Sequence, residues 1–301
     1  MIKRLFLGTT NINFINVGKT FYKIFIVESA IFITVIVMSL LGILSVNLSV
    51  DFTGGTTYQL DAPYTDIEIE EVMNSSILDV SRYQTFDNSN SIIFRATENT
   101  QDKETEFLFY LSNKFDISDE DIDFQRVGPT FGEEITEKGV QALIIFLTLV
   151  ILLITYRYEF KYSLIALAAL THDLLLVFCI YVLLGFEITP STVIALLTIL
   201  GYSLYDTVIL FDKLKDSIKT SKYSYLSIES LNKTFNEVLM RSLNTSITSA
   251  IPIASILFLG NYLGLSGTLT DFALPLFIGI LSGTYSSIFV TVPFLSKIIN
   301  N

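Results

Sequence analysis

The chain has 301 residues, of which 51% are hydrophobic and only 16% are charged, and its mean hydropathy is +0.56. This composition excludes an ordinary soluble globular domain and indicates a protein that crosses a membrane several times. The net charge of −11 argues against nucleic-acid binding, and the single cysteine, Cys179, excludes an intramolecular disulfide.

Six apolar segments are long enough to cross a bilayer core about 30 Å thick, which takes roughly 20 helical residues. They cover residues 24–46, 139–156, 161–184, 189–211, 245–263 and 272–296. Glu28 weakens the first segment, but this segment exceeds the core of a signal peptide and no small-residue cleavage site follows it. We therefore expect six transmembrane helices, with residues 1–23 as a cytoplasmic N-terminal segment.

The distribution of lysine and arginine predicts the orientation, because cytoplasmic segments collect positive charge. Four of these residues precede the first span, two lie in the turn 157–161 and six lie in the loop 212–244. The loops after the third and fifth spans contain none. We expect both termini in the cytoplasm, and residues 139–301 as a five-helix bundle whose cytoplasmic loop is 212–244.

Residues 47–138 form a long hydrophilic insert with 20 acidic residues against six basic ones, and we expect it outside the cytoplasm. The predicted elements are, in order, a strand over 49–62, an acidic helix over 65–77, strands over 82–87 and 91–97, an amphipathic helix over 104–115 and a strand over 121–128. This β-α-β-β-α-β order predicts a ferredoxin-like α+β domain between the first and second transmembrane helices. Its carboxylates are scattered over helix surfaces, so we expect neither an enzymatic activity nor a cofactor or metal site.

Two glycine-containing motifs flank this domain. Asp51 precedes the pair Gly54 and Gly55, and glycine permits unusual backbone angles and close approach. This motif is either a bulge in the strand or a hinge where the domain meets the membrane. Gly128 and Pro129 end the last strand and predict a stiff start for the second span. A plain structural connection and a link that transmits force need the same stiffness, so both interpretations of this motif stay open.

Asp206 lies within the fourth span. Insertion scales put a charged Asp at the middle of a transmembrane helix at about 2.5–3.5 kcal/mol, and such residues usually mark ion or substrate paths. Thr198 and Tyr202 share its helix face, and Ser203 and Thr207 lie alongside, so the polar residues form a stripe. The alternative is an aspartate that only pins one helix to another.

The fifth span offers a counter-charge for Asp206. Arg241 is followed by Asn244, Thr245 and Thr248 at helical spacing, and it lies in the same half of the bilayer as Asp206. A long arginine side chain could reach the carboxylate, and protonation of Asp206 would then release it. The alternative is that Arg241 extends to the lipid headgroups.

His172 and Asp173 lie midway along the third span, where a histidine beside a carboxylate can either relay protons or hydrogen-bond between helices. Both interpretations stay open. In the sixth span, Gly279 and Gly283 predict a small-residue face that packs closely against a neighbouring helix.

Several motifs together resemble one family. They are VDFTGGT (50–56), VGPTFGEE (127–134), YRYEFKYSLIALAALTHD (156–173), TVIALLTILGYSLYDTVILFDKLK (192–215) and RSLNTSIT (241–248). With the long insert after the first span, they make the chain similar to SecF-type members of the SecD/SecF protein-export family, within the resistance-nodulation-division superfamily. The family's fourth-span carboxylate falls on Asp206 and its fifth-span arginine on Arg241. The position before the carboxylate, usually Asn in the family, is Tyr205.

The resemblance implies a subunit of the bacterial cell membrane that uses the proton-motive force, together with SecD, to promote late stages of preprotein translocation through SecYEG. The implied partners are a SecD-like protein, the SecYEG translocon, an unfolded preprotein client and protons, with YajC and YidC as further candidates and no nucleic acid. Two alternatives are half of a proton-driven efflux or lipid transporter of the same superfamily, and a non-energised assembly scaffold of the translocon.

Overall fold

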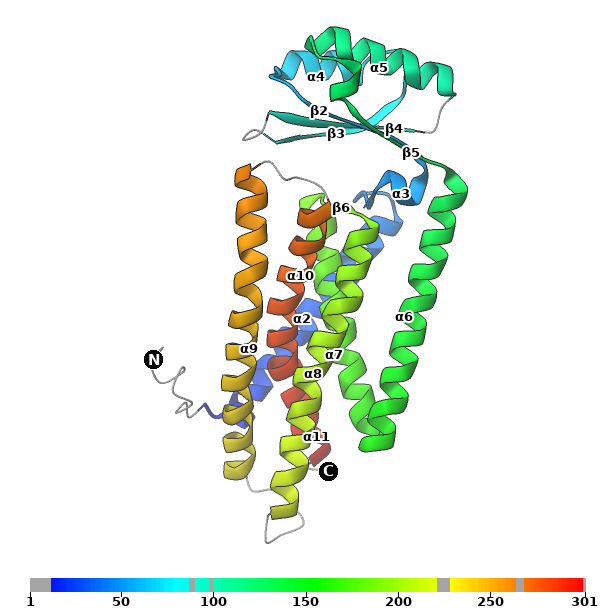
Figure 1. The fold of residues 1–301 in the computed structure, drawn as a ribbon. Coiled ribbons are helices and arrows are strands. Elements are labelled where there is room, and N and C mark those ends of the chain that lie inside the picture. Colours follow the sequence, from blue (N-terminus) through cyan, green and yellow to red (C-terminus); the bar gives the residue numbers. More distant parts are fainter. Residues whose placement is uncertain (1–11, 87–89, 98–99, 221–227, 264–267, 300–301) are drawn as a thin grey trace.

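Long helices stand side by side as a bundle, and an α/β domain sits over one end of it (Figure 1). The computed structural model describes residues 12–86, 90–97, 100–220, 228–263 and 268–299. The long helices are α2 (Phe14–Leu40), α6 (Pro129–Arg157), α7 (Phe160–Leu184), α8 (Pro190–Thr220), α9 (Ile228–Leu263) and α10 (Thr268–Tyr285). Helix α10 continues through a π-helical turn, η2 (Ser286–Val290), into α11 (Thr291–Ile299).

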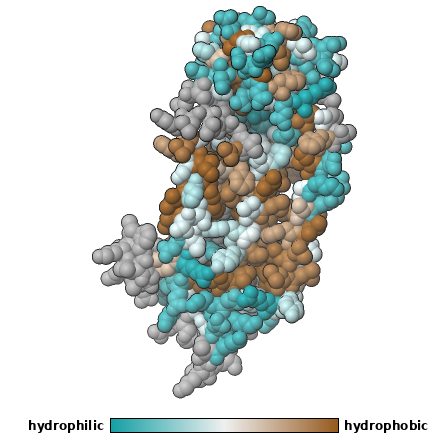
Figure 2. Space-filling model, in the orientation of Figure 1, coloured by the Kyte–Doolittle hydropathy of each residue, from teal (hydrophilic) through white to brown (hydrophobic). Residues whose placement is uncertain are grey.

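Six helical stretches of the described residues are long and apolar enough to span a membrane, which confirms the prediction of a polytopic membrane protein. They are Thr20–Leu40, Phe131–Arg157, Phe160–Leu184, Pro190–Ser217, Asn232–Gly260 and Leu269–Leu295. On the face that Figure 2 shows, apolar residues form a belt across the bundle, whereas the α/β domain is mostly hydrophilic.

Several element boundaries differ from the expected ones. Helix α2 begins at Phe14 rather than at residue 24, and α6 begins at Pro129 rather than at residue 139. The expected loop 212–244 is helical at both ends, and only residues 221–227 lie outside the described residues. Helices α8 and α9 extend into this loop because Leu214 and Phe235 are buried in the main core of the bundle, so the apolar pattern continues past the expected boundaries.

Close packing of α10 on α8 depends on two glycines. A Cβ atom on Gly279 would lie 2.1 Å from Cδ1 of Ile199, and one on Gly283 would lie 3.0 Å from Cβ of Ser203. Real Cβ atoms do not approach this closely, so only glycine permits this helix separation at Gly279. The predicted small-residue face of the sixth span is confirmed, and α8 is the helix that it contacts.

The α/β domain has the predicted order of elements. It consists of β2 (Gly55–Asp61), α4 (Asp66–Met73), β3 (Val80–Phe86), β4 (Ser91–Ala96), α5 (Gln101–Phe115), the 3-10 turn η1 (Asp119–Asp121) and β5 (Asp123–Val127). The sheet order is β3-β4-β2-β5, and every neighbouring pair is antiparallel. Both helices cover the sheet face that points away from the bundle, so the other face looks toward the membrane (Figure 1).

The core of this domain lies between the sheet and its two helices. Tyr58 and Phe94 from the sheet meet Phe107 and Leu111 from α5, and all four are fully buried. Helix α4 begins with a capping box, in which Thr65 and Glu68 each satisfy a backbone N–H of the other residue. The domain therefore has its own apolar core beside that of the bundle.

The chain enters the domain through a short helical turn, which corrects the expected continuous strand over 49–62. Strand β1 (Asn47–Leu48) leads into α3 (Val50–Thr53), which contains Asp51 and ends at Gly54, where φ is +73°. Gly55 has φ of +137°, and a Cβ atom there would lie 2.4 Å from the carbonyl oxygen of Ala96. Both glycines are thus required by the backbone, because an L side chain disfavours these angles.

The chain leaves the domain without a loop. Strand β5 ends at Val127, Gly128 is the N-cap of α6, and Pro129 is its first residue, a position that suits the fixed φ of proline. Further along α6, a Cβ atom on Gly132 would lie 2.3 Å from the carbonyl oxygen of Phe52, so α6 packs directly on α3. The entrance and exit of the domain therefore touch each other.

Candidate functional site within the membrane bundle

Asp173 on α7 lies in a cage of serine hydroxyls and is fully buried. Its Oδ1 accepts a hydrogen bond from Ser282 at 2.6 Å, and its Oδ2 accepts from Ser203 at 2.6 Å and from Ser286 at 2.8 Å. An ionised carboxylate is an acceptor with about four lone-pair sites, so three donors nearly satisfy it. The serine cage, defined as Ser203, Ser282 and Ser286, therefore joins α7, α8, α10 and η2 at one point.

The sequence positions these serines through two local features. Gly279 and Gly283 bring α10 against α8, so Ser203 comes within reach of the same carboxylate as Ser282. The π-helical turn begins at Ser286, and the Thr291 hydroxyl donates to the Ser286 carbonyl five residues before it, at 3.2 Å. Such turns inside α-helices are uncommon and often occur at functional sites.

His172 lies between two carboxylates. Its Nδ1 is 3.4 Å from Oδ1 of Asp173, and its Nε2 is 3.3 Å from Oε2 of Glu28 on α2. The hydroxyl of Tyr285 donates to the same Glu28 oxygen at 3.2 Å. The rings of Phe25 and Phe32 also lie against the imidazole, with centroids 6.1 and 5.4 Å away.

Asp206 on α8 has a different environment, although it is also buried, at 2% exposure. The Ser242 side chain from α9 lies beside it. Its Oδ2 has no hydrogen-bond partner within the part of the chain that the structure describes. Asp206 is therefore a buried carboxylate with spare acceptor capacity.

Arg241 does not form the expected ion pair with Asp206. Its guanidinium donates to the hydroxyl of Tyr205 at 2.9 Å and lies 5.7 Å from the centre of the Tyr205 ring. Both residues are on the outside of the bundle, and Tyr205 is 53% exposed. The physical reason is that the long tyrosine side chain reaches outward beside Asp206 and supplies both a hydroxyl acceptor and an aromatic face for the arginine.

The remaining predicted polar residues divide into an inner and an outer set. Thr207 is buried like Ser203, and the Tyr202 hydroxyl donates inward to Ser246 at 3.3 Å. The outer set is a seam of polar residues on the exposed side of α8 and α9, comprising Thr198, Tyr205, Arg241, Asn244, Thr245 and Thr248. Pale and teal residues interrupt the apolar belt on this side of the bundle (Figure 2).

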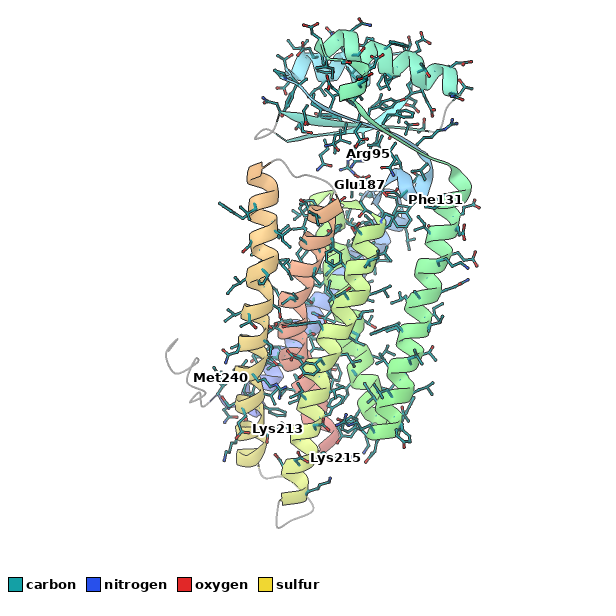
Figure 3. The ribbon with its side chains drawn as sticks, in the orientation of Figure 1. Arg95, Phe131, Glu187, Lys213, Lys215 and Met240 are labelled. Atoms are coloured by element: carbon teal, nitrogen blue, oxygen red, sulfur yellow. The ribbon has the colours of Figure 1, made fainter. Side chains whose placement is uncertain are left out.

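A separate polar contact joins the α/β domain to the bundle. Arg95 on β4 forms an ion pair of 2.6 Å with Glu187 on β6 (Glu187–Ile188), and the two side chains are 13% and 9% exposed (Figure 3). Arg82, which pairs with Arg95 across the sheet, donates to the carbonyl oxygen of Gly185 at 2.6 Å. The pKa of Glu187 is raised above its ordinary value, because the effect of burial outweighs the opposing effect of Arg95.

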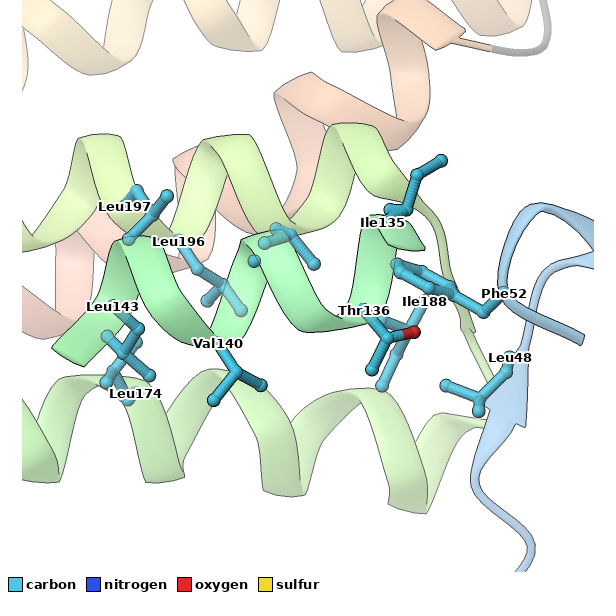
Figure 4. Close-up of a pocket in the computed structure, with 12 residues that line it drawn as sticks. Leu48, Phe52, Ile135, Thr136, Val140, Leu143, Leu174, Ile188, Leu196 and Leu197 are labelled. Carbon is cyan, nitrogen blue, oxygen red and sulfur yellow. The ribbon is translucent and has the colours of Figure 1, made fainter. Parts of the chain in front are cut away.

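An apolar cavity of about 270 Å³ lies close to this junction, between α3, α6, α7 and α8. Phe52, Val140, Leu174 and Leu196 are among its lining residues (Figure 4). Thr136 also lines it, but its hydroxyl donates to the carbonyl oxygen of Gly132 at 2.9 Å. The cavity thus offers no free polar side chain to a ligand.

The structure brings together His172 and Asp173 with Ser203, but it leaves Asp206 and Arg241 without direct contact. Sequence reasoning missed Glu28, which it treated only as a weakness in the first span. The available signal was a carboxylate within an apolar helix, the same signal that identified Asp206.

The fold and these buried groups define a polytopic membrane protein whose first two spans are separated by an α/β domain. The model of the family described as "Protein export membrane protein SecD/SecF, C-terminal" matches residues 110–301. The chain therefore belongs to the SecD/SecF family.

The particular relatives are translocase subunits. The chain is 35% identical to the protein translocase subunit SecF of Streptomyces coelicolor, over 98% of this chain and 79% of that protein. It is 30% identical to SecF of Thermodesulfovibrio yellowstonii, over 95% and 94% of the two chains. Its fold matches the crystal structure of SecDF from Thermus thermophilus, a translocon-associated membrane protein, with a TM-score of 0.83 at 28% identity. That match covers 98% of this chain and 40% of the SecDF chain.

Proposed function

We propose that the chain is a SecF-type subunit of a protein-export machinery in the bacterial cytoplasmic membrane, with both termini in the cytoplasm. The names of its relatives and its coverage of 79% of the Streptomyces SecF support this role. The chain spans two fifths of the SecDF protein, so we infer that a SecD-like partner supplies the rest of the machine.

The α/β domain is proposed to be a ferredoxin-like domain outside the cytoplasm that holds the unfolded client. The strand order β3-β4-β2-β5, with both helices on one face, supports the fold. The connection of β5 to α6 through the single residue Gly128 supports a mechanical link, because a tilt of α6 would move the sheet directly. We propose no enzymatic activity for the α/β domain. SecYEG is the proposed channel, with YajC and YidC as further partners.

Asp206 is the proposed proton carrier, and its spare acceptor capacity is the observation that carries this proposal. A carboxylate with one unpartnered oxygen can take up a proton without breaking an existing hydrogen bond. A proton moving down the gradient supplies about 2.3 kcal/mol per 100 mV, which is enough to shift a balanced conformational equilibrium. Asp173 and His172 form the second part of the proposed coupling site.

The polar seam of α8 and α9 is the proposed contact surface for the SecD-like partner. A guanidinium on the outside of a membrane bundle is costly against lipid, and Tyr205 offers it only a hydroxyl and a ring. A partner helix that carries an acidic or amide side chain would satisfy Arg241 and exclude lipid from it. In such a complex Asp206 lies on the buried side of α8, directly behind the interface.

The test is proton-driven translocation in vesicles that contain the chain, its SecD-like partner and the channel. Asp206→Asn is expected to remove the stimulation of translocation by an imposed proton gradient, because an amide cannot carry the proton. Asp212→Asn is the matched control on the same helix, since Asp212 binds Tyr158 and Arg157 at its end. It should retain the stimulation.

Unchanged stimulation in Asp206→Asn would refute the proposed proton carrier. A loss of complex formation with the partner, measured by co-purification, would favour the assembly scaffold instead.

A further inference from the structure

Glu28 is a carboxylate within the first membrane span, eight residues or about 12 Å by helical rise from the start of that span at Thr20. Its side chain is 25% exposed, so it is neither fully buried nor free in lipid. A charged side chain at such a depth costs several kcal/mol unless it is paired. His172 and Tyr285 both contact its Oε2, at 3.3 and 3.2 Å.

The imidazole between the two carboxylates can make both contacts well only when it carries a proton on each nitrogen. Protonated His172 donates from Nε2 to Glu28 and from Nδ1 to Asp173, whereas the neutral ring has a single donor. Asp173 is already served by the serine cage, so Glu28 is the carboxylate that loses most when the ring is neutral. The ionisable groups that face His172 are Glu28 from α2, Asp173 from α7 and Tyr285 from α10.

We propose that Glu28 is a further proton-coupling residue, and that one proton held on His172 fixes the first span against the bundle. Uptake of this proton from water gives an imidazolium that bridges Glu28 and Asp173. Its release leaves a neutral ring with one N–H for two carboxylates, so the charged bridge between Glu28 and Asp173 is lost and α2 loosens from α7. This inference extends the proton coupling proposed above to the first span.

The packing of α2 is consistent with such a release. The apolar side chains of Ile26, Val27 and Ile33 on α2 are more than half exposed, so they contribute little to the packing of this helix on the bundle. A cavity of about 380 Å³ also lies between α2 and α7, and His172 is one of its lining residues. The Glu28 contacts are therefore a large share of the polar attachment of this helix.

The native cysteine provides a direct reporter of α2 position. Cys179 on α7 is 4% exposed and packs in one small cluster with Phe32 and Val35 of α2. It is the only cysteine in the chain, so a thiol reagent reports a single site. When α2 loosens, these two side chains uncover the thiol.

The experiment measures the alkylation rate of Cys179 by a small membrane-permeant reagent at several pH values, in lipid nanodiscs. Each rate is divided by that of Glu28→Gln at the same pH, which cancels the ionisation of the thiol itself. Losing a hydrogen bond between charged groups costs about 1.5–3 kcal/mol, so this ratio should change by about tenfold or more across the titration of the site. Thr34→Ala is the control on α2, since its hydroxyl only bonds the carbonyl of Ala30.

The expected result is that the ratio changes with pH in the natural chain and in Thr34→Ala. A ratio that stays constant with pH in the natural chain would overturn the proposal. If Glu28→Gln does not insert, His172→Gln, which removes the same bridge, replaces it as the reference. Asp206→Asn separates this inference from the proposed function, because it should stop gradient-driven translocation while the Cys179 profile persists.

Discussion

Asp173 and Asp206 are two buried carboxylates in one bundle, and their surroundings are opposite. Asp173 accepts three short serine hydrogen bonds from three other elements, α8, α10 and η2. Asp206 has an oxygen with no hydrogen-bond partner among the described residues, and the cation expected beside it donates to Tyr205 instead. Both lie on central helices, and Ser203 of the Asp173 cage is only three residues before Asp206.

The difference separates two uses of the same side chain. A carboxylate whose lone pairs are occupied holds helices together, and protonating it would disrupt several contacts at once. A carboxylate with an oxygen that accepts no hydrogen bond contributes little to helix packing, and it can gain a proton or a new partner at small structural cost. Burial alone therefore does not distinguish a structural aspartate from a proton carrier, whereas the number of its donors does.

The largest expected effect comes from making the same substitution at both positions. Asp173→Ala should lower the free energy of unfolding by about 3–5 kcal/mol, because it leaves three buried hydroxyls without their acceptor. Asp206→Ala should cost about 1 kcal/mol, the usual net value of the single hydrogen bond it loses. Reversible unfolding in mixed detergent micelles measures both. Equal losses of unfolding free energy in the two variants would show that Asp173 and Asp206 do not differ in this way.

A smaller effect is expected from the helix contact that builds the cage. Gly279→Ala places a methyl group against Ile199, and overpacking of this kind costs about 1–3 kcal/mol. Gly201→Ala on α8 is the matched control, because a Cβ atom there meets no other atom within 4 Å. It should be neutral or stabilising, since alanine favours helix. The same unfolding assay applies, and a Gly279→Ala chain as stable as the control would show that α10 can move without loss.

The smallest effect concerns a third carboxylate, which lies outside the membrane spans. Glu187 resembles Asp206 in having one buried oxygen, Oε1, without a partner in the described part of the chain, although Arg95 holds the other oxygen. Burial raises the pKa of Glu187 above its ordinary value of 4.5, so the folded state binds this proton more tightly than the unfolded state. The corresponding stabilisation is present below that value and is lost as the pH rises through the raised pKa.

The natural chain should therefore lose stability relative to Glu187→Gln as the pH rises through this window. Unfolding measured at a series of pH values checks the slope, and Glu159→Gln in an exposed turn is the control. A slope of the opposite sign would mean that the ion pair with Arg95 outweighs burial.

Much of the fold follows from patterns within single segments. Apolar length identified the spans, the order of strands and helices in the α/β domain was correct, and Gly279 and Gly283 marked a close helix contact. A buried polar side chain such as Asp206 could be found because a charge in an apolar helix is visible in the sequence.

The partners of the buried groups could not be predicted in the same way. Which helices face each other depends on packing between distant segments, so the pairing of Glu28 with His172 had no local signal. The sequence shows Tyr205 where the family usually has Asn, but only the structure shows that its hydroxyl accepts a hydrogen bond from the guanidinium of Arg241. The end of the expected loop 212–244 was also misplaced, because buried Phe235 continues the helix and its apolar pattern into that loop.

The π-helical turn at Ser286–Val290 gives the last helix a rotational phase that an unbroken α-helix would not have. Each residue advances an α-helix by about 100°, so removing one residue from this turn would restore regular winding and rotate everything after it. Val292 and Leu295, now buried in the core, would turn away from it. One inserted position thus sets the angular register between the serine cage and the C-terminal anchor of the bundle.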